Sequence, residues 1–181
     1  HDILGTYQIV SNSEEMNRVP ASAEELTALL KTRHAALLAG RPEKQPGWFK
    51  EKENRADDTV FVAPELVAGT LLKGFEPCQA LDNPLARAMY MMFLIAEVHP
   101  FADGNGRVGR ALALWELYRR GFDSHHIFSV DEFYWENRPR YHASLAAAGK
   151  GGELSAWLEY YAEGLLATLE RVWLRMQDLA A

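Results

Sequence analysis

The run from Leu85 to Val98 constrains the fold of this chain more than any other segment. Its apolar residues occupy nearly every face of the helix that their spacing predicts. A helix that is hydrophobic all round has to be buried by other elements, so this one belongs at the centre of a helical bundle. Asn83-Pro84 provides a capping residue before a proline, and His99-Pro100 ends the run because a residue before proline avoids the helical region.

A second buried helix is predicted to open after Gly106 and to close at Arg119-Arg120-Gly121, so two core helices flank one loop. Two strand-like runs, 48–52 and 59–62, surround the polar turn 54–58 and predict a β-hairpin. Further helices are expected over 22–40, from Pro64 to just before Gly74, and over 129–137, 139–148 and 154–179. The predicted fold class is all-α, a helical bundle with one β-hairpin.

Length and composition favour one compact domain. The chain has 181 residues, 48% of them hydrophobic, which suffices for a core without disulfides or a structural metal. We divide this domain into an N-terminal segment and helix (1–40), a core that contains the hairpin at 48–62 (41–170), and the end of the last helix (171–181). Because the chain starts at His1 and not at Met, we expect a fragment or a processed product.

Charge and cysteine content exclude several functions. The net charge is -6 and no long Lys/Arg run occurs, so neither a nucleic acid nor an anionic membrane surface is an expected partner. Cys78 is the only cysteine, so no internal disulfide can form, and no Cys/His spacing typical of zinc occurs. The adjacent His125 and His126 are interpreted as loop residues. Without a signal peptide or an apolar run of about 18 residues, the sequence predicts a cytoplasmic location.

The loop between the two core helices combines groups that suit phosphate chemistry. Gly104 and Gly106 surround Asn105 directly before a helix, so backbone N–H groups and the positive end of the helix dipole can converge on an anion. Arg107 and Arg110 are three residues apart and can reach neighbouring phosphate oxygens from the first turn. These residues predict an anion site.

The same loop contains a candidate metal ligand and a candidate base. Asp103 offers the hard oxygen that Mg²⁺ needs when phosphates and water fill its other positions. His99 can accept a proton from a hydroxyl near neutral pH. Each feature alone has a commoner interpretation: a helix-end histidine, a turn, or a solvated pair of arginines. Together they indicate in-line displacement at phosphorus.

The segment His99 to Arg110 resembles the Fic family signature, His-x-Phe-x-(Asp/Glu)-Gly-Asn-Gly-Arg-x-x-Arg, at every fixed position. The resemblance implies that His99 is the base and that Asp103 binds Mg²⁺ or Mn²⁺. It also implies that Gly104 to Gly106 with Arg107 cradle the phosphates of ATP, and that Arg110 clamps them. The hairpin would be the flap that covers the nucleotide and pairs with an extended segment of the target protein.

The resemblance also implies an activity, the transfer of AMP from ATP to a Ser, Thr or Tyr hydroxyl of a target protein. The Doc branch, which transfers phosphate, has Lys where this chain has Gly106. A Fic enzyme that uses a different nucleotide is one alternative. A non-catalytic helical regulatory or interaction domain is another, but its mark would be the loss of His99, Asp103 or Arg110, and all three are present.

The resemblance also implies contacts to the nucleobase. Thr59, Val60, Phe61 and Val62 correspond to the flap strand that faces the nucleotide, and Tyr141-His142 resembles a Tyr-Tyr pair that related members place near the base. His142 departs from that pair, which leaves the choice of base less firmly indicated than the phosphate chemistry.

Many Fic proteins are inhibited by a helix with the pattern (Ser/Thr)-x-x-x-Glu-(Gly/Asn), whose Glu binds the second Arg of the signature. Glu15 and Glu159 have a serine at the right distance but are followed by Met16 and Tyr160, and Glu163-Gly164 lacks the Ser or Thr. We therefore expect the inhibitory Glu upstream of His1 or on a separate antitoxin chain. A homodimer is left open.

Overall fold

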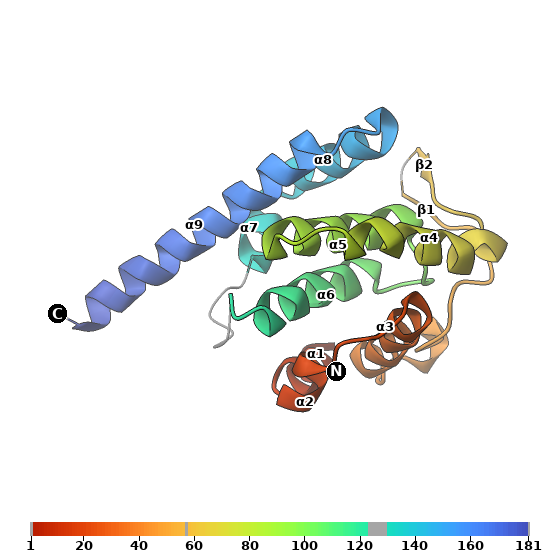
Figure 1. Ribbon diagram of the computed structural model, residues 1–181, viewed down its shortest axis with the longest axis horizontal. Helices are drawn as coiled ribbons and strands as arrows, with labels where there is room; N and C mark the ends of the chain where they lie inside the picture. The colour runs from red at the N-terminus through yellow and green to blue at the C-terminus, as the bar shows by residue number, and fades with distance from the viewer. Residues whose placement is uncertain (1, 57, 123–129, 181) are drawn as a thin grey trace. The chain divides into compact units, whose positions relative to one another are not determined.

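The computed structural model describes residues 2–56, 58–122 and 130–180, and it confirms the all-α class with a two-stranded hairpin (Figure 1). Contacts group the chain into two compact units, 1–122 and 123–181. His125 and His126 lie outside the described residues, and the division into segments at 40 and 170 stays a prediction. No helix in the described part of the chain is long and apolar enough to cross a membrane.

The first unit contains six α-helices, two short 3₁₀ helices and the hairpin in the part that is described. In chain order these elements are α1 (Asp2–Val10), α2 (Ser13–Asn17), α3 (Ala23–Leu37), η1 (Pro42–Lys44), β1 (Arg55–Ala56), β2 (Thr59–Val60), η2 (Pro64–Leu66), α4 (Val67–Gln79), α5 (Pro84–Val98) and α6 (Asn105–Arg119). The pair α5 and α6 lies at the centre of this unit, as the sequence predicted (Figure 1). Ile95 on α5 and Leu112 on α6 belong to the hydrophobic core and are at most 1% exposed.

The predicted helix caps form where the sequence places them. The Asn83 side chain accepts hydrogen bonds from the backbone N–H groups of Leu85 and Ala86 at the start of α5. The Ser22 hydroxyl accepts from Glu25 N–H at the start of α3, and the Glu25 carboxylate accepts from Ala21 N–H. Each cap satisfies N–H groups that have no partner within the helix, and so fixes the end of a core helix.

Helix α4 corrects one prediction. It was expected to end before Gly74 but continues to Gln79. A Cβ atom on Gly74 would overlap Leu94 Cδ1, so the missing side chain lets α4 approach α5 closely. The glycine here is a packing residue, and its interpretation as a helix terminator was wrong.

The hairpin is shorter than predicted and its first strand is shifted. Strands β1 and β2 pair antiparallel, Arg55 with Val60 and Ala56 with Thr59, and Phe61 N–H donates to Asn54 O. The prediction of a strand at 48–52 was wrong. That segment forms a hydrogen bond with the loop after α5 instead of pairing with a strand, since Lys50 N–H donates to Pro100 O at 2.9 Å.

Two helices precede the first one that the sequence predicted. Helix α2 is capped by Asn12, whose side chain accepts from Glu14 and Glu15 N–H, and its Met16 is completely buried.

Helix α6 also begins earlier than expected, at Asn105, so Gly106 lies inside its first turn.

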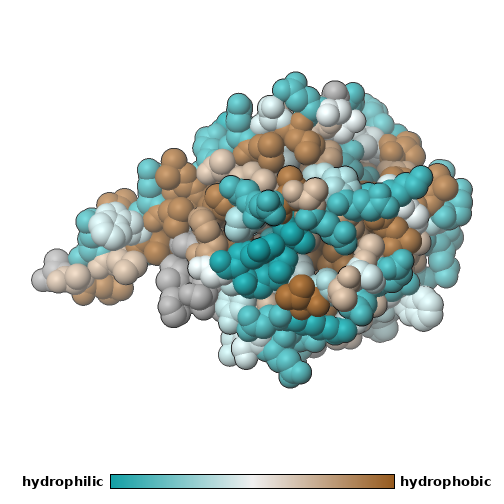
Figure 2. Space-filling view, in the orientation of Figure 1, coloured by the Kyte–Doolittle hydropathy of each residue, from teal (hydrophilic) through white to brown (hydrophobic). Residues whose placement is uncertain are grey.

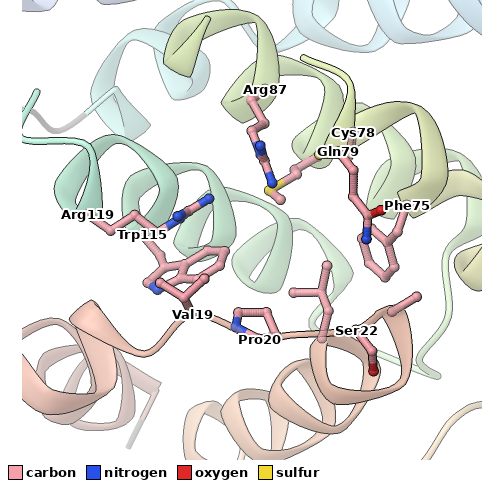
Figure 3. Close-up of a pocket in the computed structure, with 12 residues that line it drawn as sticks. Val19, Pro20, Ser22, Phe75, Cys78, Gln79, Arg87, Trp115 and Arg119 are labelled. Carbon is pink, nitrogen blue, oxygen red and sulfur yellow. The ribbon is translucent and has the colours of Figure 1, made fainter. Parts of the chain in front are cut away.

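Buried charges lie at the end of the α5–α6 pair that is remote from the connecting loop. Glu116 is fully buried, and its carboxylate pairs with Arg119 Nε at 2.6 Å and with Arg87 Nε and Arg120 Nε at 3.4 Å. Arg87 and Arg119 also line a small cavity beside Cys78 (Figure 3). Burial raises the pKa of the Cys78 thiol to about 11, so the thiol stays protonated and is a poor nucleophile.

The second unit consists of α7 (Asp131–Glu136), α8 (Arg138–Gly151) and α9 (Ser155–Ala180) in its described part. Its core is a set of packed aromatic rings: Phe133, Tyr134, Tyr141, Trp157, Tyr160 and Tyr161. Apolar side chains on the last turns of α9 are exposed, including Trp173 at 60% and Leu179 at 89% (Figure 2).

Candidate active site

Two residues in the left-handed region turn the chain from α5 into α6. His99 caps the C-terminus of α5 with φ 50° and ψ 57°, and its N–H donates to Ile95 O at 3.0 Å. Gly104 caps the N-terminus of α6 with φ 81°, where a Cβ atom would lie 3.2 Å from Leu38 Cδ1. The loop 99–104 therefore has a defined path that begins at the candidate base and ends at the candidate phosphate site.

His99 has the protonation state that a general base needs. Its Nδ1 lies 3.2 Å from Ala96 O, and because a carbonyl can only accept, Nδ1 carries the proton. Nε2 is then an acceptor, and no hydrogen bond to it is found among the described residues. Burial lowers the pKa of His99, and the charge of Lys50 lowers it further, although the bond to Ala96 opposes both. The ring is neutral at pH 7. It also stacks on Phe61 of the hairpin, with centroids 3.8 Å apart and planes 10° from parallel.

A buried lysine and an asparagine hold the backbone around His99. Lys50 is 3% exposed, and its ammonium group donates to Asn54 Oδ1 at 2.6 Å and to Val98 O at 3.4 Å. The Asn54 amide group donates in turn to Phe101 O at 3.0 Å and to His99 O at 3.4 Å. The base of the hairpin is thus bonded directly to the loop.

The carboxylate of Asp103 faces several cations. Oδ1 lies 3.1 Å from Arg107 Nη2, and Oδ2 lies 3.7 Å from Lys44 Nζ and 4.0 Å from Arg41 Nη1. Partial burial raises the pKa of Asp103, but the bond from Gly104 N–H and the charge of Arg107 outweigh it and leave the pKa lowered. Asp103 is therefore ionised, as a metal ligand must be.

The start of α6 offers donors to an anion. Its N-cap residue is Gly104, which has no side chain to cap the first turn. The Asn105 side chain is occupied within the loop, where it accepts from Phe101 N–H at 2.9 Å and donates to Phe101 O at 2.8 Å. A Cβ atom on Gly106 would lie 3.1 Å from Arg110 Nη1, so the Arg110 guanidinium lies across Gly106. The Asn105 side chain therefore stabilises the loop, and its predicted phosphate contact stays a prediction.

The donor set fits a metal that is delivered with a nucleotide. Within the described residues no group of three His, Cys, Asp or Glu side chains could hold a metal ion. Mg²⁺ bound to phosphates and water needs only one or two protein carboxylates, and Asp103 is the candidate for that role.

The predicted nucleobase contacts are distributed over both units. Thr59 and Val60 are exposed on β2, whereas Val62 is half-buried against the core of the first unit. Tyr141 and His142 belong to α8 of the second unit, where Tyr141 packs against Trp157 with ring centroids 5.9 Å apart. Their contact with a nucleotide stays a prediction.

The glutamates considered for inhibition have other partners. Glu15 forms an ion pair with Arg18 at 3.8 Å, and its backbone carbonyl accepts from Arg33. Glu163 forms two hydrogen bonds with Arg140, at 2.7 and 2.6 Å. The location of the inhibitory Glu outside residues 1–181 stays a prediction.

Sequence reasoning missed Lys50, Asn54 and His34. His34 is completely buried on α3 and bonds to the loop through Asp103 O, at 3.0 Å from Nε2. One signal could have found it: His34 lies on the same helical face as Leu30 and Leu37, an apolar stripe where a polar ring needs partners. Nothing in the pattern around Lys50 distinguished it from a surface lysine.

Comparison with known proteins agrees with this site. The model of the Fic/DOC family matches residues 25–117. A Fido domain-containing protein of Dictyostelium discoideum is 30% identical in an alignment of 117 residues that covers 55% of this chain and 81% of that protein. The protein adenylyltransferase fic-1 of Caenorhabditis briggsae is 36% identical in an alignment of 143 residues that covers 76% of this chain and 27% of that protein.

Solved structures share the fold. A Fic family protein from Desulfovibrio desulfuricans has a TM-score of 0.77 and 19% identity, and the match covers 94% of this chain and 51% of that one. Fic-1 from C. elegans has a TM-score of 0.73 and 23% identity over 98% of this chain and 52% of that one. The chain thus spans about half of each solved chain.

The protein belongs to the Fic/DOC family. Within that family, it is similar to proteins named protein adenylyltransferase.

Proposed function

We propose that the protein is an adenylyltransferase that moves AMP from Mg²⁺-bound ATP to a Ser, Thr or Tyr hydroxyl of a target protein. The observation that carries this proposal is the state of His99, a neutral ring with Nε2 as its free acceptor at the entrance of an anion-binding loop. A Gly at 106, where the phosphate-transferring branch has Lys, favours transfer of AMP over transfer of phosphate.

His99 would remove the proton of the attacking hydroxyl. Nε2 accepts that proton, and the resulting imidazolium is stabilised by the Nδ1–H bond to Ala96 O and by the negative end of the α5 dipole. Lys50 and Asn54 keep the backbone of His99 in place during this step.

The other end of the loop would hold the triphosphate. The N–H groups of the first turn of α6 and the Arg110 guanidinium would donate to phosphate oxygens. Asp103 would hold Mg²⁺ or Mn²⁺, which supplies positive charge that stabilises the phosphates. The hydroxyl oxygen would bond to the α-phosphorus as the bond from that phosphorus to the β-phosphate oxygen breaks, and pyrophosphate would leave. Arg107, Lys44 and Arg41, which face the Asp103 carboxylate, would be able to donate to phosphate oxygens.

The hairpin would receive the target. Thr59 and Val60 form a short exposed strand beside Phe61, whose ring contacts His99. An extended target segment that paired with β2 would therefore bring its hydroxyl next to the base.

Labelled ATP separates the two transfer reactions. The protein is incubated with Mg²⁺, host lysate and ATP labelled at either the α- or the γ-phosphate. We expect protein labelling from α-labelled ATP alone, and none with His99→Ala. Labelling from the γ-position would show phosphate transfer, and competition by unlabelled GTP, CTP and UTP would reveal a different nucleotide.

A further inference from the structure

A residue outside the signature, His34 on α3, contacts the loop at three points. Its ring stacks on Phe101, with centroids 3.8 Å apart and planes 7° from parallel. Its Nε2 lies 3.0 Å from Asp103 O, and a Cβ atom on Gly104 would lie 3.4 Å from the ring. The side chain is fully buried, so it supports the loop from the interior side.

The second ring nitrogen fixes the tautomer. Gly47 N–H donates to Nδ1 at 2.9 Å, so Nδ1 is an acceptor and the proton of the neutral ring is on Nε2. Nε2–H therefore donates to Asp103 O. The N–H of Gly47, which lies between η1 and the hairpin, thus makes His34 the donor and Asp103 O the acceptor.

This bond determines the orientation of one peptide group. The peptide between Asp103 and Gly104 has its carbonyl held by His34, and its N–H donates to the Asp103 carboxylate. If this peptide rotated, the carboxylate would lose its donor and the Gly104 N–H would point elsewhere. The side of the loop that faces metal and phosphate thus depends on His34.

We infer that His34 is a positioning residue for nucleotide transfer: by donating from Nε2 to Asp103 O, it holds the metal ligand and the entrance to the phosphate site in their binding geometry. This inference rests on the proposed function. It assigns to His34 no contact with substrate.

Two substitutions divide the roles of the ring. In His34→Gln the amide nitrogen can occupy the place of Nε2 and keep the bond to Asp103 O, but the acceptor for Gly47 is lost. In His34→Asn the amide oxygen can occupy the place of Nδ1 and keep the bond from Gly47, but the donor to Asp103 is lost. Both variants lose the stack on Phe101. They differ from each other in which bond remains and in one methylene of side-chain length. Thr32→Ala, exposed on the same helix, is the neutral control.

We expect the Kd of Mg²⁺–ATP, measured by calorimetry, to rise about fivefold more in His34→Asn than in His34→Gln, as loss of one net hydrogen bond predicts. Amide exchange at Gly104, measured without nucleotide, should be faster in His34→Asn than in His34→Gln. The melting temperatures of the two variants should be similar. Equal Kd values and equal exchange rates in the two variants would reduce His34 to a core residue and overturn the inference.

The wild-type protein gives a test that needs no variant. Long-range ¹H–¹⁵N NMR of the His34 ring should show the proton on Nε2, and a proton on Nδ1 would overturn the inference even if both variants failed to fold. If the wild type bound no Mg²⁺–ATP, the proposed function would fail. The exchange rate at Gly104 would still decide whether His34 holds the loop.

Discussion

Asn54→Ala should destabilise the protein more than its half-buried position suggests. Its side chain accepts from the ammonium group of Lys50 and donates to the carbonyl oxygens of His99 and Phe101. The substitution leaves a lysine that is 3% exposed, and within the described structure the remaining acceptor of its ammonium group is the backbone carbonyl of Val98 at 3.4 Å. It also releases the loop at the candidate base.

The cost follows from these bonds. A hydrogen bond to a charged group contributes about 1.5–3 kcal/mol and a neutral one about 1 kcal/mol, so the loss is roughly 3 kcal/mol. A protein of this size loses about 2–4 °C in melting temperature per kcal/mol, which gives a decrease of about 6–12 °C.

The decrease should depend on pH with a definite sign. Burial lowers the pKa of Lys50 below 10.5 in the folded protein, so between the folded and unfolded pKa values the unfolded chain binds more protons. Stability therefore rises with pH through that interval. Asn54→Ala removes the main acceptor of the charged form, so its penalty is largest at neutral pH and shrinks as pH rises toward 10.5.

Thermal unfolding of Asn54→Ala and wild type across this pH range, with the exposed variant Lys52→Ala as control, checks the prediction. A melting temperature equal to that of wild type at neutral pH would refute the role of Asn54. A difference that does not change with pH would refute the role of Lys50.

The remaining predictions concern packing, the base and the metal. Gly74→Ala should lower the free energy of unfolding, measured in urea, by about 1–3 kcal/mol, because its Cβ would overlap Leu94. Gly69→Ala in the same helix meets nothing within 4 Å and should raise the free energy of unfolding by up to about 1 kcal/mol. Because burial lowers the pKa of His99 from 6.5, the loss of kcat/KM with decreasing pH should begin only below pH 6.5. A loss that already begins above pH 6.5 would contradict the assignment of His99 as the base. Asp103→Asn should raise the Mg²⁺ concentration for half-maximal transfer by about tenfold or more, and an unchanged requirement would remove Asp103 from the metal site.

The central helices and the chemistry of the loop could be predicted because local rules determine them. The run 85–98 is apolar on nearly every face and lies between Asn83-Pro84 and His99-Pro100, which predicts a central buried helix with these ends. Helix α5, capped by Asn83 and His99, confirms that prediction. The types of residue between His99 and Arg110 indicate their chemistry without knowledge of their positions.

What could not be predicted depends on contacts between distant segments. Gly74 lies inside a helix because Leu94 packs against it, and 48–52 is not a strand because Lys50 bonds to Pro100. The role of His34 depends on Gly47 and Asp103, which lie 13 and 69 residues away. No local pattern carries such information.

Transfer and ATP binding measured together in His99→Ala test the central claim most directly. In the proposed mechanism Nε2 acts on the attacking hydroxyl and contributes little to binding of the nucleotide. The variant should therefore lose transfer of α-labelled AMP while its Kd for Mg²⁺–ATP, measured by calorimetry, stays within about twofold of wild type. Near-normal turnover in His99→Ala would show that the base is another group, and would contradict the account of this site.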